Sequence, residues 1–244
     1  GPPPTRLISG VPEHVDGSML TIAEHAGARW IHRDRMWHYT EGIRNWAPIW
    51  KDHGIRILPG PSSLWLDATG CRLPPPCLPG FDTLSTLAHI GHSGHDYTWF
   101  VLTRRIIEKE FALSGSEQNP DLTGRSIRGV LARVLPGPPG PVQAFMDRGE
   151  DFVVAPTLDE LMTGMERVGD PGVLEPDRVR AAVEARDGAF ANAFTTDAQV
   201  AALRTARHYR GRRWIRVAPP HRLLDPTSAP LVPVPPHLPP PPPL

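Results

Sequence analysis

Apolar residues recur every three or four positions in five stretches of the chain, which is the spacing of one face of an α-helix. One stretch opens with Thr157 and Glu160, which form a capping box. Leu158, Leu161 and Met165 then follow at helical spacing. The pattern predicts helices near Asp16–Ala26, Tyr97–Leu113, Ser126–Val134, Thr157–Met165 and Asp177–Arg186.

Alternating or short apolar runs predict strands elsewhere. Within Gly54–Asp67, the sequences I-R-I-L and S-L-W-L-D flank a Pro/Gly turn, which indicates two strands or a hairpin. Shorter strands are predicted at Arg29–Ile31, Asp151–Ala155 and Trp214–Val217. Four prolines within Leu73–Gly80 predict a loop there. The mixture of helices and strands predicts an α+β fold.

The composition is that of a globular protein, with one exception. The 26 basic residues balance 26 acidic residues, so bulk charge gives no support for binding to nucleic acid or to a membrane surface. No apolar run reaches the length that spans a bilayer. The exception is proline, which makes up 31 of 244 residues and eight of the last twelve. Residues 226–244 are therefore predicted to form a disordered polyproline tail that adds no strand and no core.

The spacing of cysteine and histidine does not predict a metal site. Cys71 and Cys77 are separated by five residues, which is neither a metal-binding pair nor a redox pair, so two free thiols are expected. His89, His92 and His95 recur every third residue, whereas zinc sites on a helix more often use the i, i+4 spacing.

The stretch Glu13–Gly42 says most about function. Asp16-Gly17 precedes the first predicted helix, Gly27 follows it, and His38-Tyr39-Thr40-Glu41-Gly42 comes after a short apolar run. This order resembles the flavoprotein family of fumarate reductases, succinate dehydrogenases and 3-ketosteroid 1-dehydrogenases, in which a T-G-D-G-x-x-M/L-A-x-x-x-G-A helix precedes an H-P-T-G segment. The resemblance covers residues 2–232 and points to the bacterial FAD-binding dehydrogenases grouped with ketosteroid dehydrogenases. It implies FAD as the cofactor.

The resemblance also implies a division of the chain. Residues 1–37 match the end of an α/β FAD-binding domain, residues 38–225 match the substrate cap, and residues 226–244 form the proline-rich tail. The G-x-G-x-x-G fingerprint that binds the FAD pyrophosphate does not occur in these residues, and the family's closing glycine-rich segment is also missing. We therefore expect a central fragment whose partner is a missing complementary flavoprotein segment. The tail is interpreted as the product of a frameshift, a hypothesis that the nucleotide sequence tests.

Several site residues follow from the resemblance. Asp16 and Gly17 match the turn that contacts the flavin. His38 and Tyr39 are the expected catalytic pair on the substrate side, because a histidine there can donate a hydrogen bond to a carbonyl or carboxylate oxygen. A histidine packed beneath an aromatic strand explains His38 equally well. Where the family has a catalytic arginine or tyrosine, the nearest residue in this chain is Phe81, which can donate no proton, so that role is not carried over.

The polar loop S-G-S-E-Q-N-P-D is the third expected site. Its Ser114, Glu117 and Asn119 are expected to bind substrate, because small and amide-bearing residues often line sites in loops. An ordinary linking loop with Asp121 as a helix cap is the alternative.

These features predict part of a cytoplasmic FAD-dependent oxidoreductase that acts on a C–C bond next to a carbonyl or carboxylate of a small apolar molecule. The fragment is expected to be inactive alone. The alternative is a non-catalytic interaction module whose polyproline tail binds SH3-type or EVH1-type domains. Neither hypothesis includes a nucleic-acid partner or a membrane span.

Overall fold

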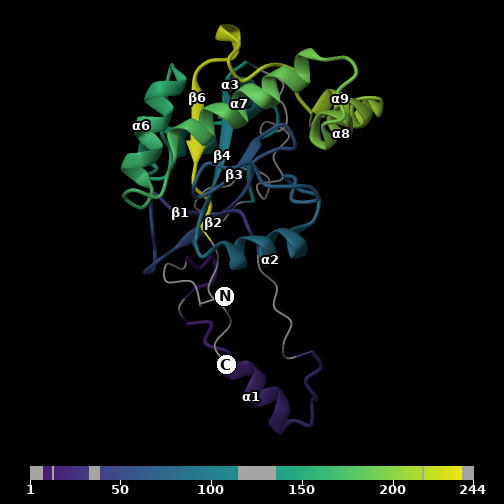
Figure 1. Cartoon of the computed structure of the whole chain (residues 1–244). Coiled ribbons are helices and arrows are strands. Elements are labelled where there is room, and N and C mark those ends of the chain that lie inside the picture. The colour runs from purple at the N-terminus through teal and green to yellow at the C-terminus, as the bar shows by residue number, and fades with distance from the viewer. Residues whose placement is uncertain (1–7, 13, 33–38, 115–135, 216, 238–244) are drawn as a thin grey trace.

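The computed structural model describes residues 8–12, 14–32, 39–114, 136–215 and 217–237, and it has two small antiparallel sheets at its centre (Figure 1). The first sheet has the order β1-β2-β5, formed by Gly42–Arg44, Gly54–Leu58 and Ala112–Leu113. The second has the order β3-β4-β6, formed by Leu64–Asp67, Thr98–Thr103 and Leu231–Val234. The mixture of helices and antiparallel strands confirms the α+β prediction.

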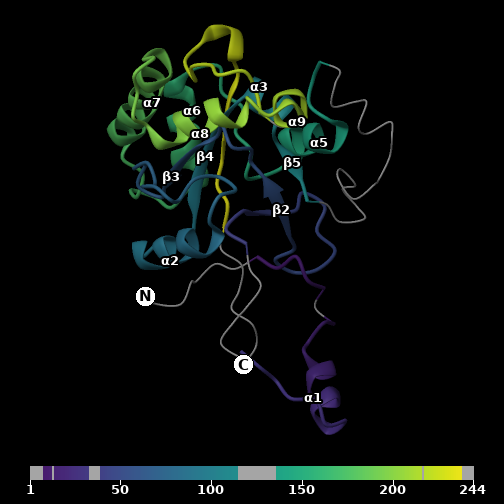
Figure 2. The ribbon, with the colours of Figure 1, turned by 90° about the vertical axis from the view of Figure 1, so that its right-hand side faces the viewer.

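Helices surround the two sheets. α6 packs on β6, α7 packs on β3, and α5 lies beside β5 (Figures 1 and 2). α1 lies apart from the rest in both views, and none of its residues is buried. The bounds are Ser18–His25 for α1, Thr83–Ser93 for α2, Arg104–Lys109 for α3, Gly140–Arg148 for α5, Leu158–Val168 for α6, Pro176–Ala191 for α7, Ala198–Ala206 for α8, Arg210–Ile215 for α9 and Pro226–Ser228 for the 3-10 helix η1.

β4 is the centre of the core, and it corrects the helix predicted at Tyr97–Leu113. All six residues of β4 are buried, because β3 and β6 pair with its two edges while helices cover the sheet. The run T-W-F-V-L-T is rich in β-branched and aromatic residues, which favour a pleated strand. The helix begins only at α3, where the hydroxyl of Thr103 accepts a hydrogen bond from the backbone N–H of Ile106. β5 follows α3 within the same predicted helix.

Some of the other predicted helices and strands are confirmed, and others are wrong. α1, α6 and α7 confirm three predicted helices, and the two strands within 54–67 are confirmed, although β2 and β3 join different sheets rather than one hairpin. The strand at 214–217 is wrong, because α9 extends through Ile215. Arg29–Ile31 forms no strand, and residues 151–155 contribute only one bridge, between Ala155 and Leu231. The helix predicted at Ser126–Val134 lies outside the described residues.

The proline-rich C-terminal segment is part of the fold as far as it is described. Leu231, Val232 and Val234 are buried in β6 and pair with β4. Pro233 is tolerated because β6 is an edge strand, where a missing N–H need not break a ladder. The backbone N–H of His237 donates to the Gly42 carbonyl at 2.7 Å. The prediction that this segment adds no strand and no core is therefore wrong for residues 231–237.

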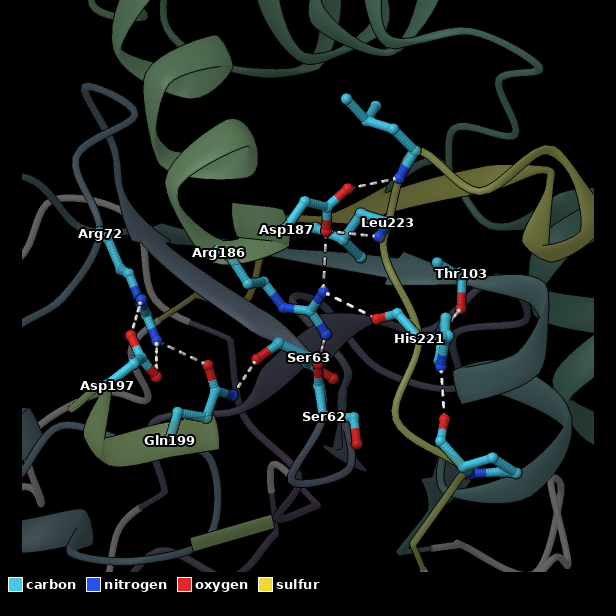
Figure 3. A network of polar contacts seen from close by, with 12 residues as sticks. Ser62, Ser63, Arg72, Thr103, Arg186, Asp187, Asp197, Gln199, His221 and Leu223 are labelled. Carbon is cyan, nitrogen blue, oxygen red and sulfur yellow. Dashed lines mark hydrogen bonds and ion pairs between the residues drawn. The ribbon is translucent and has the colours of Figure 1, made fainter. Parts of the chain in front are cut away.

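A buried polar network joins α7 to the segment that leads to β6 (Figure 3). The side chain of Arg186 is fully buried, and burial lowers its pKa to about 10. Its Nη2 donates to the Ser62 carbonyl at 2.7 Å, and its Nη1 contacts the Asp187 carboxylate and the His221 carbonyl at 3.3 and 3.4 Å. The Asp187 carboxylate also accepts hydrogen bonds from the backbone N–H of Leu223 and of the residue after it. The network therefore fixes residues 221–224 against α7.

Candidate functional site

Buried polar side chains gather around β1, next to the His38–Gly42 motif. Gly42 pairs with Arg56 of β2 on one side and forms a bridge with His237 on the other. A Cβ on Gly42 would lie 2.9 Å from the Ile8 side chain and 3.2 Å from the His237 carbonyl, so a larger residue does not fit without displacement. The close packing of three backbone segments at this glycine brings Glu41 and Arg56 into contact.

Glu41 and Arg56 form a poorly satisfied ion pair. Oε2 of Glu41 lies 3.8 Å from Nε of Arg56, and neither of these buried atoms has a hydrogen-bond partner among the described residues. Burial raises the pKa of the Glu41 carboxyl, while the charge of Arg56 acts in the opposite direction. A carboxyl with a raised pKa and a buried oxygen that accepts no hydrogen bond from the described residues holds a proton more readily than an exposed carboxyl, and such groups cluster at functional sites.

Arg56 also connects two of the sites predicted from sequence. Its guanidinium carbon lies 3.7 Å from the centre of the Tyr39 ring, a cation–π geometry. The backbone N–H of Ser114 donates to the Arg56 carbonyl at 2.9 Å. Tyr39 and Ser114, which are 75 positions apart in sequence, thus meet the same residue of β2. His38, Glu117 and Asn119 lie outside the described residues.

Asp151 holds β1 in place through Arg44, the last residue of this strand. Its carboxylate is 1% exposed and accepts three hydrogen bonds from Arg44, from the backbone N–H, Nε and Nη2, at 2.6–2.9 Å. Nε2 of His237 lies 3.7 Å away. Burial alone would raise the pKa of Asp151, but its contacts with His237 and Arg44 outweigh burial and hold it below its ordinary value. A charged Asp151 therefore fixes β1, the strand that begins directly after Glu41.

An open hollow lies beside the loop between β1 and β2. Pro12, His14, Ile49 and Trp50 line it, and its volume is about 530 Å³, within the range of small-molecule sites. The Trp50 ring stacks on His53 with 3.6 Å between ring centres. The lining is largely apolar, which suits an apolar molecule.

Asp16 and Gly17 form the turn at the start of α1. Gly17 has a φ of 82°, a left-handed conformation that favours glycine, and among the described residues a Cβ there would meet Leu20 alone, at 3.7 Å. Oδ1 of Asp16 accepts a hydrogen bond from the Ser18 N–H at 2.9 Å, and this bond lowers the pKa of Asp16. The charged carboxylate fits a hydroxyl or N–H group of FAD that approaches the open glycine. It does not fit the pyrophosphate, which it would repel.

Metal and membrane sites find no support in the described part of the chain. No group of three or more His, Cys, Asp or Glu side chains there is arranged to hold a metal ion. His89, His92 and His95 are exposed or half-buried on and just after α2, and Cys71 and Cys77 are free thiols. None of the helices in these ranges combines the length and apolarity needed to cross a bilayer.

Comparison with known proteins gives the family. The family described as "FAD binding domain" matches residues 1–237. The chain belongs to this family. A KsdD-like steroid dehydrogenase from Mycolicibacterium smegmatis is 61% identical over 235 residues, which are 96% of this chain and 43% of that protein. Two KsdD-like steroid dehydrogenases from Mycobacterium tuberculosis strains are 61% and 60% identical over 236 residues, which are 96% of this chain and 42% of each. The chain thus spans less than half the length of the curated relatives it matches.

The family assignment confirms the resemblance seen in the sequence and FAD as the cofactor it implied. Glu41 and Arg56 were not among the site residues predicted from the sequence. Glu41 lies inside the H-Y-T-E-G motif, and its ionisable side chain was the feature of the sequence that could have marked it as a site residue. In the sequence, Arg56 occupies a polar position of a predicted strand in which apolar and polar residues alternate. Asp151 and His237 carried no local signal, because their partners lie far away in sequence.

Proposed function

We propose that the chain forms the substrate cap and an adjoining part of the FAD domain of a flavin-dependent dehydrogenase, which removes hydrogen from adjacent carbons next to a carbonyl of a steroid-like substrate. The Glu41–Arg56 pair beside Tyr39 carries this proposal, since the buried Oε2 of Glu41 has no hydrogen-bond partner in the part of the chain that the structure describes. The steroid dehydrogenase relatives support the substrate class. Residues 1–37 belong to the FAD domain and residues 38–225 to the cap in this proposal.

The residues of the chain have separate tasks in the proposed reaction. FAD, when bound, supplies the acceptor for the hydride. Asp16 and Gly17 would contact the non-phosphate part of FAD. Glu41 holds a proton at Oε2. The positive charge of Arg56 stabilises the ionised form of Glu41, whereas burial alone would favour the neutral form.

The remaining site residues orient the substrate. His38 and Tyr39 donate hydrogen bonds on the substrate side, and the ring of Tyr39 is held by the guanidinium of Arg56. Ser114 approaches the same strand through its backbone contact with Arg56, and Glu117 and Asn119 from the same loop complete the substrate-binding group in this proposal. The open, largely apolar hollow at Trp50 offers an apolar surface to the substrate in this proposal.

The interaction-module alternative receives no support from the described residues. Pro233 and the residues up to His237 pair with β4, β1 and Tyr97 inside the fold, so they are not available as an extended polyproline ligand.

The test uses a chimera in which residues 2–232 replace the matching segment of the Mycolicibacterium smegmatis relative. Steroid dehydrogenation and flavin content are measured for Glu41→Gln, Tyr39→Phe and His38→Ala. We expect Glu41→Gln to lower kcat/KM by about 10²–10⁴-fold at unchanged flavin content, the range for loss of a general acid or base. Glu166→Gln, at an exposed position of α6, is the matched control. Equal turnover in Glu41→Gln and the control would reject a proton-transfer role for Glu41.

A further inference from the structure

One end of the molecule carries an excess of positive charge. Between Ala198 and Leu224 the sequence has seven arginines and no Asp or Glu, although the whole chain has a net charge of zero. This stretch forms α8 and α9, which lie together at the side of the molecule opposite α6 (Figure 1). The charge is therefore local: four of the seven arginines belong to α8 and α9, and Arg207 lies between these helices.

Two of these arginines hold the local structure, and three others face solvent. Arg204 donates to the carbonyls of the loop between α7 and α8, and Arg207 donates to the Val217 carbonyl at 2.6 Å. Arg210, Arg212 and Arg213 are exposed. Among the described residues, no carboxylate forms an ion pair with any of these three. Their charges are available to an external anion.

Two large aromatic side chains are exposed beside these arginines. Phe194, in the loop between α7 and α8, is 92% exposed, and Tyr209, between α8 and α9, is 69% exposed. Arg204 donates to the Ala193 carbonyl at 3.3 Å, which places the Phe194 loop against the C-terminal half of α8. Tyr209 follows that half directly. A Cβ on Gly211 would lie 2.8 Å from the Tyr209 ring, so glycine leaves room for the ring over the start of α9.

We propose that this basic–aromatic surface, formed by Phe194, Tyr209, Arg210, Arg212 and Arg213, docks on an anionic lipid bilayer. Clustered arginines are attracted to anionic headgroups, and phenylalanine and tyrosine insert at the boundary between headgroups and acyl chains. An exposed phenylalanine has no role in a purely ionic contact, whereas it gains free energy on entering the bilayer surface.

The choice of a bilayer over another polyanion rests on the proposed function. A steroid-like substrate partitions into membranes, so an enzyme that docks there meets its substrate at a higher local concentration. Nucleic acid presents the same negative charge and also stacks on aromatic rings. It is therefore the competing partner that the experiment has to separate.

The experiment measures co-sedimentation of the 244-residue chain with vesicles of phosphatidylcholine alone and of phosphatidylcholine containing one-third phosphatidylglycerol, at low and high salt. We expect binding to the anionic vesicles only. The double variant Arg212→Gln/Arg213→Gln should weaken it about 25-fold, at about fivefold for each arginine. Lys51→Gln/Arg167→Gln removes the same charge from exposed positions outside α8 and α9 and should bind as the parent does. Phe194→Ala should remove the binding that remains at high salt.

Several outcomes would overturn the proposal. They are equal binding to neutral and anionic vesicles, equal losses in the two double variants, and tighter binding to single-stranded or duplex nucleic acid than to anionic vesicles in the same salt. Circular dichroism and thermal unfolding establish that each variant is folded. Because the assay needs neither flavin nor turnover, it fails or succeeds independently of the activity test on the chimera.

Discussion

Replacing Arg186 by methionine should test whether the polar network in Figure 3 holds the fold together. Arg186 is the only arginine on α7 whose side chain is fully buried among the described residues. Methionine has a similar length and leaves the packing largely filled, but it offers no donors and no charge. The change therefore isolates the polar contribution to stability from the loss of volume.

The expected loss of unfolding free energy is about 3–5 kcal/mol. The carbonyls of Ser62 and His221 lose their donor, and a buried polar group without a partner costs about 1–3 kcal/mol. The carboxylates of Asp187 and Glu110 lose a buried counter-charge, and removing one partner of a buried pair costs about 3–5 kcal/mol. These contributions overlap. Both carboxylates keep backbone N–H donors, so the loss should lie near the lower end.

Urea unfolding monitored by circular dichroism at neutral pH measures this loss. The control is Arg180→Met on the same helix, where the arginine is 43% exposed and pairs with Asp159, which is 78% exposed. An exposed ion pair contributes less than about 1 kcal/mol. If Arg186→Met lost no more stability than Arg180→Met, the network would be a consequence of packing rather than a source of stability.

Three further predictions concern the site and its surroundings. Because burial raises the pKa of Glu41 in the folded state, the parent should gain stability relative to Glu41→Gln as pH falls from neutral through that raised pKa, and lose it as pH rises. Urea midpoints over a pH series check this, and a constant difference would contradict it. Gly60→Ala should cost more than about 1 kcal/mol, since φ is 89° and a Cβ would lie 2.4 Å from the Cβ of Glu110. Its control is Gly91→Ala in α2, where a Cβ meets nothing within 4 Å and should instead stabilise by about 0.5–1 kcal/mol in the same urea unfolding assay. The 244-residue chain should not retain FAD through gel filtration, because it has no G-x-G-x-x-G turn for the pyrophosphate and Asp16 would repel phosphate; stoichiometric flavin absorbance in the protein peak would refute this.

The sequence determined the features that depend on neighbouring residues. Thr157 caps α6 through the Glu160 N–H, as the capping box predicts, and α7 begins at Pro176 as expected for proline in a first turn. The turn after β3 is equally local, since the Asp67 carboxylate accepts hydrogen bonds from Thr69 and Cys71. The order of the glycines, the histidine and the aromatic residues before Gly42 was sufficient to predict the family and FAD.

Tertiary structure decided the elements and contacts whose partners lie far away. The apolar spacing over 97–113 predicted a helix although the residues at 98–103 favour a strand, and the pairing of this run with β3 and β6 decides for the strand. The C-terminal prolines predicted an unstructured tail, but burial against β4 makes residues 231–234 a strand. The contacts of Arg56 with Tyr39 and Ser114, and of Asp151 with Arg44 and His237, join segments separated by up to 107 positions. A local pattern holds no information about such contacts, because the packing of the sheets brings these side chains together.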